Sequence, residues 1–330
     1  MNTKSTSRQA GNLSRRTFVI GTAAATASQA LGGLHDATQI PIIDTHIHLF
    51  DATRPQGAPY TGPGGDSPKV SLPPNYRQLA EPLGIVGAVK VEASPWVEDN
   101  LWALQVAQTD PMIVGVIGNL QPEKPEFTEY LNRHHRNPLF RGIRYGNLWG
   151  YDLAKQARNP IFIEGLKRLA DADLVLDSAN PNVKLLQGII RITDQVPELR
   201  IIVDHLPAME PTAASRAAYQ QALAELKHRS NVFVKLSTVI HRVNGRVLTD
   251  LSSHRDRLDE LMEVFGEDRV IFGSDWPNSD GVTSLDNIVN IVREYFAAQP
   301  GRVAKKYFWQ NSAKVYKWIQ RSDNQPTASA

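Results

Sequence analysis

Short runs of apolar, β-branched residues alternate with longer helix-like segments from Ile40 almost to the C-terminus. This alternation predicts parallel strands joined by crossover helices. The expected strands are Ile40–Phe50, Ile85–Ala93, Met112–Leu120, Phe140–Gly146, Leu174–Asn180, Arg200–Leu206, Val232–Ser237 and Val270–Trp276, and the expected helices cover residues 99–109, 123–136, 160–171, 183–196, 213–229, 250–266 and 283–298.

Eight strand–helix repeats favour a closed (β/α)8 TIM barrel in one domain, over residues 39–322. An open, doubly wound sheet is the alternative. The 330 residues suffice, because such a barrel needs about 250 residues. The Pro-, Gly- and Ser-rich segment 51–74 predicts a long loop after the first strand. Loops that follow barrel strands lie at the C-terminal mouth, where substrates bind.

The two ends of the chain differ from its body. Residues 1–38 contain Ser14-Arg15-Arg16-Thr17-Phe18-Val19 and then an Ala-rich stretch, which predicts a twin-arginine export leader and linker. A genuine leader would place the mature protein in the periplasm, whereas a tail with two chance arginines would leave it in the cytoplasm. Residues 323–330 are expected to form an unstructured tail.

Composition narrows the chemistry. The sequence contains no cysteine, which excludes disulfides, thiolate metal sites and cysteine nucleophiles. The net charge of +2 gives no broad basic field for nucleic acid. The body of the chain has no apolar stretch long enough for a membrane span. The expected partner is a small molecule, and a monomer and a homodimer remain equally open.

Two histidines end the first predicted strand. Alternation along a strand places His46 and His48 on the same side, at the barrel mouth, where two imidazoles suit a divalent metal such as Zn²⁺. His205 ends the sixth predicted strand and Asp275 ends the eighth. A carboxylate that faces these histidines can bind metal and accept a proton from water. Asp275 and His205 are therefore both catalytic and metal-binding candidates.

The second and fourth predicted strands carry buried charge. Glu92 is a candidate metal ligand or acceptor for a ligating histidine, with an internal ion pair among Lys90, Glu92, Asp177 and Lys235 as the alternative. On the fourth strand, Arg144 is the candidate for binding a carboxylate or sulfonate on the substrate, with a structural salt bridge as the alternative. His241 follows the seventh strand in a mouth loop and is a candidate substrate contact. His134, His135, His228 and His254 are expected on solvated helix faces.

Several short motifs together resemble the amidohydrolase-related family, which includes lactonases for 2-pyrone-4,6-dicarboxylate, 4-sulfomuconolactone and sugar acids. They occur in family order over residues 42–316. The matching stretches are Ile43-Asp44-Thr45-His46-Ile47-His48, Gly142-Ile143-Arg144, Val203-Asp204-His205, Val234-Lys235-Leu236-Ser237, Gly273-Ser274-Asp275-Trp276-Pro277 and Asn311-Ser312-Ala313.

The resemblance implies lactone hydrolysis in a barrel, with His46, His48, His205 and Asp275 at the polar centre. The family often has Gln in place of Glu92 and His in place of Tyr145, which leaves Tyr145 as a candidate substrate contact. Some members work without metal, so metal-independent action is an alternative to a Zn²⁺ cofactor.

The expected function is hydrolysis of a small anionic lactone such as 4-sulfomuconolactone, with Asp275 as general base and Arg144 as anchor. A sugar-acid lactonase and a metal-dependent decarboxylase of the same superfamily are the enzyme alternatives. A periplasmic binding barrel without catalysis is the alternative from another class, against which the converging histidines and Asp275 argue.

Overall fold

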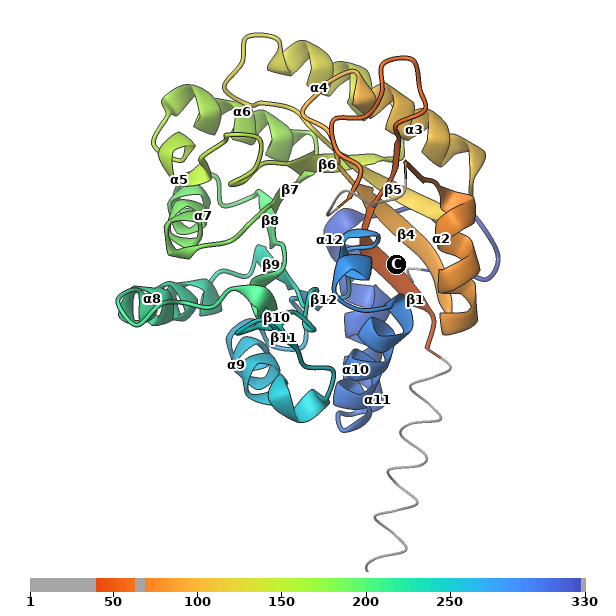
Figure 1. Ribbon diagram of the computed structural model, residues 1–330. Helices are drawn as coiled ribbons and strands as arrows, with labels where there is room; N and C mark the ends of the chain where they lie inside the picture. Colours follow the sequence, from red (N-terminus) through yellow and green to blue (C-terminus); the bar gives the residue numbers. More distant parts are fainter. Residues whose placement is uncertain (1–39, 63–68, 328–330) are drawn as a thin grey trace, which may run out of the picture.

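A ring of parallel strands surrounded by helices forms the body of the protein (Figure 1). The computed structural model describes residues 40–62 and 69–327, so the predicted leader lies outside the described residues. Eight strands pair in chain order. They are β1 Ile42–His48, β4 Ile85–Val91, β5 Ile113–Gly118, β6 Phe140–Arg144, β7 Val175–Ser178, β8 Arg200–Val203, β9 Val232–Lys235 and β12 Val270–Ile271.

The segment after β12 closes the ring against β1. The amide of Thr45 donates to the carbonyl of Phe272 at 3.1 Å, and the amide of Asp275 donates to His46 at 2.8 Å. The amide of His48 donates to Trp276, also at 2.8 Å. The predicted (β/α)8 barrel is therefore confirmed, and the open sheet is not what forms. Closure also brings the first and last predicted strands together at the mouth.

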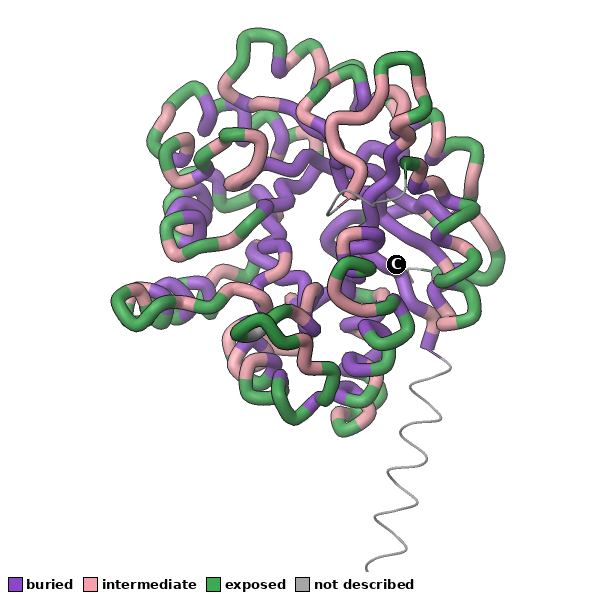
Figure 2. Tube along the Cα trace, viewed as in Figure 1, coloured by how far each residue is buried: buried purple, intermediate pink, exposed green. Residues whose placement is uncertain are grey.

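Two apolar layers hold the barrel. One fills its interior and includes Ile43, Val89, Val175 and Ile271. The other lies between the strands and the surrounding helices. The strands are accordingly buried on both faces, as expected for parallel strands, and Figure 2 shows exposure mainly on helix exteriors and loops. For this reason the sequence of each strand is a nearly continuous apolar run.

The helices follow the predicted spacing closely, and several begin at recognisable caps. Asn182 Oδ1 accepts from the amide of Leu185 at 2.8 Å at the start of α7, and Asn159 precedes a proline at the start of α6. No helix among the described residues combines the length and apolar character that a membrane crossing requires. The predicted helices are observed as α3 Asp99–Thr109, α4 Phe127–His135, α6 Pro160–Asp171, α7 Val183–Gln195, α8 Arg216–Lys227, α9 Arg255–Phe265 and α10 Leu285–Ala297.

The long loop after β1 contains structure that its composition does not predict. Two short antiparallel pairs and four further α-helices were missed, because each strand pairing has only two residue pairs and each helix has at most eight residues. They are β2 Phe50–Asp51 with β3 Val70–Ser71, β10 Arg242–Val243 with β11 Arg246–Val247, and the helices α2 Pro73–Ala80, α5 Leu153–Gln156, α11 Gly301–Lys305 and α12 Asn311–Tyr316.

The C-terminal segment covers the end of the barrel where the strands begin. Asn311 on α12 donates to the carbonyl of Val270 at 2.8 Å. Gln325 is buried and donates to the carbonyls of Val86 and Pro111, both at 2.9 Å. The expectation of an unstructured tail from residue 323 is therefore wrong as far as residue 327. Polar composition concealed this segment, because a glutamine that satisfies strand-end carbonyls leaves no apolar signal.

His134 was expected on a solvated face but is buried between Tyr130 and Phe140. Neither ring nitrogen has a hydrogen-bond partner among the described residues. Burial, with the nearby charge of Arg133, lowers the pKa of His134 from 6.5 to about 4. Between pH 4 and pH 6.5, His134 therefore binds a proton in the unfolded chain but not in the folded protein.

We expect the free energy of unfolding to fall as pH is lowered from 6.5 to 4, by up to about 3 kcal/mol from this residue. In His134→Leu this contribution should disappear. Urea unfolding of both proteins at several pH values measures the difference between them. The same substitution at the exposed His135 is the control, and equal acid sensitivity in all three proteins would contradict the assignment.

Candidate active site

Two histidines at the C-terminal end of β1 point into the barrel. The pairing of β1 with β4 shifts register between Asp44 and Ile47, which re-aims the side chains that follow. His46 and His48 then lie with their Nε2 atoms 3.2 Å apart and their rings at 79°. A Cβ at Gly273 would lie 2.9 Å from the Cβ of His46. The glycine therefore leaves the room that the first imidazole occupies.

The backbone fixes which nitrogen of His48 carries the proton. Its Nδ1 lies 3.2 Å from the carbonyl oxygen of Val91, which can only accept. Nδ1 therefore carries hydrogen, and in the neutral ring Nε2 has a lone pair. That lone pair faces Oδ1 of Asp275 at 3.2 Å. Two acceptors held this close favour a cation or proton at this point of the site.

His205 and Asp275 both lie just beyond a strand, in a left-handed backbone conformation. Their φ angles are +55° and +65°, a region that side chains other than glycine rarely adopt. Nδ1 of His205 lies 2.8 Å from Oγ of Ser237, which orients the ring. Strained backbone of this kind is concentrated at functional sites. Here it directs both side chains to the histidines of β1.

The two oxygens of Asp275 have different surroundings. Oδ1 lies 3.2 Å from Nε2 of His48, 3.6 Å from Nε2 of His46 and 3.7 Å from Nε2 of His205. Asn278 Nδ2 also donates to Oδ1, at 3.1 Å. No group among the described residues bonds to Oδ2. One oxygen thus anchors the carboxylate and the other is free to meet a substrate or water.

The protonation states suit a base that is ionised at neutral pH. Burial opposes ionisation of Asp275, but His205, His48 and Arg144 outweigh it and hold its pKa below the usual range. Burial, with the charges of Lys235 and Arg144, lowers the pKa of His205 to about 4, against the opposing effect of Asp275. The imidazole of His205 is therefore neutral near pH 7.

Arg144 at the end of β6 is paired inside the barrel. Its Nε donates to Oε1 of Glu92 at 2.7 Å, and its Nη2 donates to the carbonyl of Glu92 at 2.9 Å. Trp149 Nε1 donates to Oε2 of Glu92 at 3.2 Å. Glu92 thus forms an internal ion pair, but with Arg144 and not with Lys90, Asp177 or Lys235. Arg144 keeps both hydrogens of Nη1 and one of Nη2 for other partners.

A charged network fills the barrel below the histidines. Lys235 Nζ lies 2.6 Å from Asp177 Oδ2, 3.0 Å from Asp204 Oδ1 and 3.2 Å from His46 Nδ1. Tyr316 on α12 donates to Asp177 from the opposite end of the barrel, at 3.0 Å. All these side chains are buried. The network connects the C-terminal cap to the base of the site.

A cavity of about 240 Å³ opens above these groups at the mouth. Tyr60 from the long loop after β1 and Trp149 from the loop after β6 approach edge to face at 6.4 Å. Tyr60 donates to Asn278 Oδ1 at 2.5 Å, and burial, with the charge of Asp275, raises the pKa of Tyr60 to about 12. The lining residues are His48, Tyr60, Ala93, Arg144, Leu148, Trp149, Ala179, Asn180, His205, Asp275 and Asn278.

Comparison with known proteins identifies the family to which this barrel belongs. The model of the amidohydrolase family matches residues 43–318, which includes every group described above. The chain belongs to the amidohydrolase family. It is 28% identical over 248 residues to an L-fucono-1,5-lactonase of Burkholderia ambifaria, covering 72% of this chain and 80% of that one. It is 27% identical over 249 residues to a 4-sulfomuconolactone hydrolase of Rhizobium radiobacter, covering 72% and 75%.

A solved structure supports the fold of this amidohydrolase. An amidohydrolase from Burkholderia multivorans with bound zinc superposes with a TM-score of 0.73 at 22% identity, covering 84% of this chain and all of that one. The likeness extends to the whole barrel and its helices. It confirms the architecture of the barrel.

The residues of the amidohydrolase site fit a divalent cation. His46, His205 and Asp275 each offer a ligand atom within 4.8 Å of the others, and the lone pair of His48 faces the same point. The ion pairs around the histidines join four carboxyl groups, of Glu92, Asp177, Asp204 and Asp275, to only two side chains that are not histidines, Arg144 and Lys235. Burial, together with the charge of Asp177, raises the pKa of Asp204 to about 7 against the effect of Lys235. A divalent ion would balance this excess of carboxyl groups.

Glu92 does not join the group of candidate ligands. Both of its carboxylate oxygens accept hydrogen bonds, from Arg144, Trp149 and the amide of Ser94. The sequence could not choose between a ligand and an ion pair, because both need a buried carboxylate on this strand. The distances favour the ion pair.

Two predicted substrate contacts lie away from the cavity. Tyr145 follows Arg144 directly and so faces outward, where it stacks on Tyr151 and donates to Glu123 at 3.1 Å. His241 lines a different cavity, near α9, with Nδ1 2.8 Å from the carbonyl oxygen of Val239. The structure therefore does not bring either residue to the site. For Tyr145, strand alternation decides the outcome once Arg144 faces inward.

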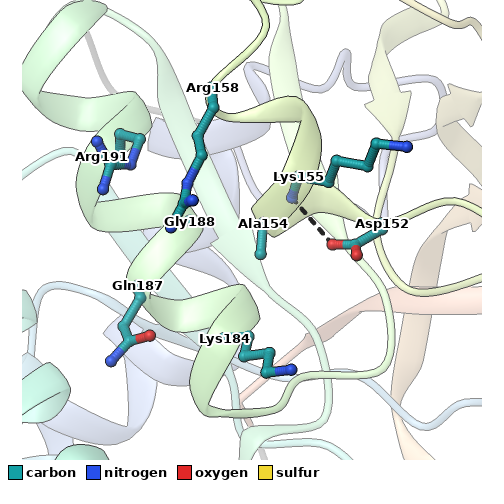
Figure 3. A pocket seen from close by; sticks show the side chains of 8 residues that line it. All are labelled: Asp152, Ala154, Lys155, Arg158, Lys184, Gln187, Gly188 and Arg191. Carbon is teal, nitrogen blue, oxygen red and sulfur yellow. Dashed lines mark hydrogen bonds between the residues drawn. The ribbon is translucent and has the colours of Figure 1, made fainter.

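The volume of a cavity does not identify the site in this amidohydrolase. A cleft of about 540 Å³ lies between α5 and α7, far larger than the cavity at Asp275. Figure 3 shows that it contains exposed basic side chains and none of the converging histidines. Buried polar convergence is the better criterion. The cleft is lined by Asp152, Ala154, Lys155, Arg158, Lys184, Gln187, Gly188 and Arg191.

Sequence reasoning missed Tyr60, Trp149 and Asn278. All three lie in loops at the C-terminal ends of strands, which is the one signal that could have drawn attention to them. Asp204 and Lys235 belong to two of the matched motifs, but the motifs alone did not predict that these side chains contact His46. Their importance rests on distances to His46 that only the closed barrel creates.

Proposed function

We propose that the protein hydrolyses a small monocyclic lactone, with Asp275 as the general base. The observation that carries this proposal is the asymmetry of the Asp275 carboxylate. Asn278 donates to Oδ1 and three histidine nitrogens lie within 3.7 Å of it, whereas Oδ2 accepts no hydrogen bond among the described residues, and Asp275 lines a cavity of about 240 Å³. A base must be fixed in orientation and within reach of the proton that it removes.

In the proposed reaction Oδ2 takes a proton from water as the water oxygen bonds to the lactone carbonyl carbon. The ring C–O bond then breaks, and Asp275 returns the proton to the departing oxygen. His205 and Arg144 line the cavity, and the guanidinium of Arg144 stabilises the negative charge that develops on the carbonyl oxygen. A divalent metal held by His46, His48, His205 and Asp275 would polarise the carbonyl or the water.

The charge of the cavity favours an uncharged, sugar-type lactone. Glu92 takes two of the donor groups of Arg144, so its charge is largely balanced. The wall also supplies the aromatic rings of Tyr60 and Trp149, whose polar hydrogens are donated to Asn278 and Glu92, and the hydroxyl oxygen of Tyr60 can still accept from a ring hydroxyl of the substrate. The similarity to L-fucono-1,5-lactonases supports the same substrate class.

An anionic lactone is the second candidate. It would bind through the guanidinium of Arg144, which lines the cavity, and the similarity to 4-sulfomuconolactone hydrolase supports it. Because Glu92 accepts from Nε and from one hydrogen of Nη2, much of the charge of Arg144 is already balanced, which weakens its attraction for a sulfonate. We therefore rank the neutral lactone first.

A substrate panel separates these possibilities. The purified protein is given L-fucono-1,5-lactone, other neutral sugar lactones, 4-sulfomuconolactone and 2-pyrone-4,6-dicarboxylate, and acid release is followed at constant pH. We expect kcat/KM to be highest for a neutral lactone. A preference for the sulfonate would favour the second candidate. Release of CO2 from an aromatic acid, without turnover of any lactone, would replace lactone hydrolysis with decarboxylation.

A further inference from the structure

The ring of His46 faces two competing partners at the nitrogen that points away from the cavity. Nδ1 lies 3.2 Å from Lys235 Nζ, which can only donate, and 3.7 Å from Asp204 Oδ2, which as a carboxylate can only accept. Asp204 Oδ1 pairs with Lys235 at 3.0 Å, whereas Asp204 Oδ2 is buried and accepts no hydrogen bond among the described residues. A buried carboxylate oxygen without such a partner is costly and calls for an explanation.

We infer that Lys235 and Asp204 select between the two neutral tautomers of His46. When Lys235 donates to Nδ1, the ring hydrogen is on Nε2. When Asp204 accepts from Nδ1, the ring hydrogen is on Nδ1 and the lone pair of Nε2 is free to bind a cation. The proton moves from one ring nitrogen to the other, and the imidazole stays neutral in both forms.

The contacts on the cavity side decide which form exists without a cation. Nε2 of His46 lies 3.2 Å from Nε2 of His48, which is an acceptor because Val91 fixes the hydrogen of that ring on Nδ1. A hydrogen on Nε2 of His46 turns this contact into a donor–acceptor pair. Arg144 Nη1 lies 3.4 Å from the same atom, but it has Asp204 Oδ2 as an alternative acceptor at 3.8 Å. The form stabilised by Lys235 therefore predominates.

A cation on Nε2 reverses the choice. Nδ1 must then carry the hydrogen, and Asp204 Oδ2 is the acceptor beside it. A ligating histidine usually donates its second ring hydrogen to a carboxylate, and removal of that acceptor typically weakens metal binding by about 10- to 100-fold. Asp204 and Lys235 are thus positioning residues that act through His46.

Nitrogen NMR of the full-length protein with ¹⁵N-labelled histidine tests the inference. His46 is assigned by comparison with His46→Asn, and Zn²⁺ is the probe. In chelator-treated protein we expect hydrogen on Nε2 of His46, and after Zn²⁺ is added we expect it on Nδ1. Hydrogen on Nδ1 in the chelator-treated protein would overturn the role of Lys235.

Metal affinity provides a second readout that does not depend on activity or on the substrate. Zn²⁺ dissociation constants are measured against a chromophoric chelator for the wild type, Asp204→Asn and Asp177→Asn. We expect Asp204→Asn to weaken binding by about 10- to 100-fold. Asp177→Asn removes a carboxylate from the same lysine but not one that faces His46, so its loss should be smaller. Equal losses would reduce Asp204 to a general charge effect and overturn its assignment.

Discussion

Asp275→Asn is expected to lower kcat for the preferred lactone by about 10²- to 10⁴-fold, the range that a positioned general base contributes. Asparagine keeps the shape of the side chain and an acceptor for Asn278, so the local backbone should persist. It cannot take a proton from water at neutral pH. Because the base acts in the transition state, kcat and kcat/KM should fall together while substrate binding changes little.

Steady-state kinetics on wild type and variant, with circular dichroism to confirm folding, measure this effect. Asp286→Asn, on the exposed face of α10, is the matched control and should leave both constants unchanged. A folded Asp275→Asn variant with wild-type kcat would remove Asp275 from the proposed chemistry.

Lys235→Met should cause the largest loss of stability. The side chain is fully buried and lies 2.6 Å from Asp177 and 3.0 Å from Asp204. Methionine fills similar volume but leaves two carboxylates without their shared cation. Removal of one partner from a buried ion pair typically costs about 3–5 kcal/mol, because the charge left behind stays desolvated.

Urea unfolding monitored by fluorescence measures the change in the free energy of unfolding. Lys227→Met is the control, since Lys227 pairs with Glu263 at 3.1 Å on the surface. Exposed pairs of this kind contribute less than about 1 kcal/mol. If both variants lost the same small amount, the buried network would not contribute to stability in the way that its geometry indicates.

The strands of the barrel could be predicted because each one coincides with a continuous run of apolar residues in the sequence. Each run contains a strand that is buried on both faces, so its apolar character is continuous and its position is clear. The last strand was predicted too long, since only Val270 and Ile271 pair regularly before the backbone turns towards His46. The positive φ of Asp275 shows why. A functional turn replaces strand geometry at that end.

The centre of the site could be predicted in part, for a different physical reason. Parallel strands bring their C-terminal ends to one mouth, so His46, His48, His205 and Asp275 had to approach one another once the barrel closed. What topology does not supply is the choice among buried partners. Glu92 binds neither a histidine nor a lysine. Its carboxylate instead accepts from the guanidinium of Arg144, which comes from β6, two strands away from β4.

The cap formed by α12 also has a consequence for biosynthesis. Tyr316 completes the surroundings of Asp177, and Asn311 and Gln325 satisfy strand-end carbonyls, yet all three are synthesised after the eight strands that they support. Before this segment has been made, the buried carboxylate of Asp177 lacks the hydrogen bond that Tyr316 donates. The fold therefore reaches full stability only after this segment has been made, and a chain terminated before α12 should remain open to proteases that the protein with this segment resists.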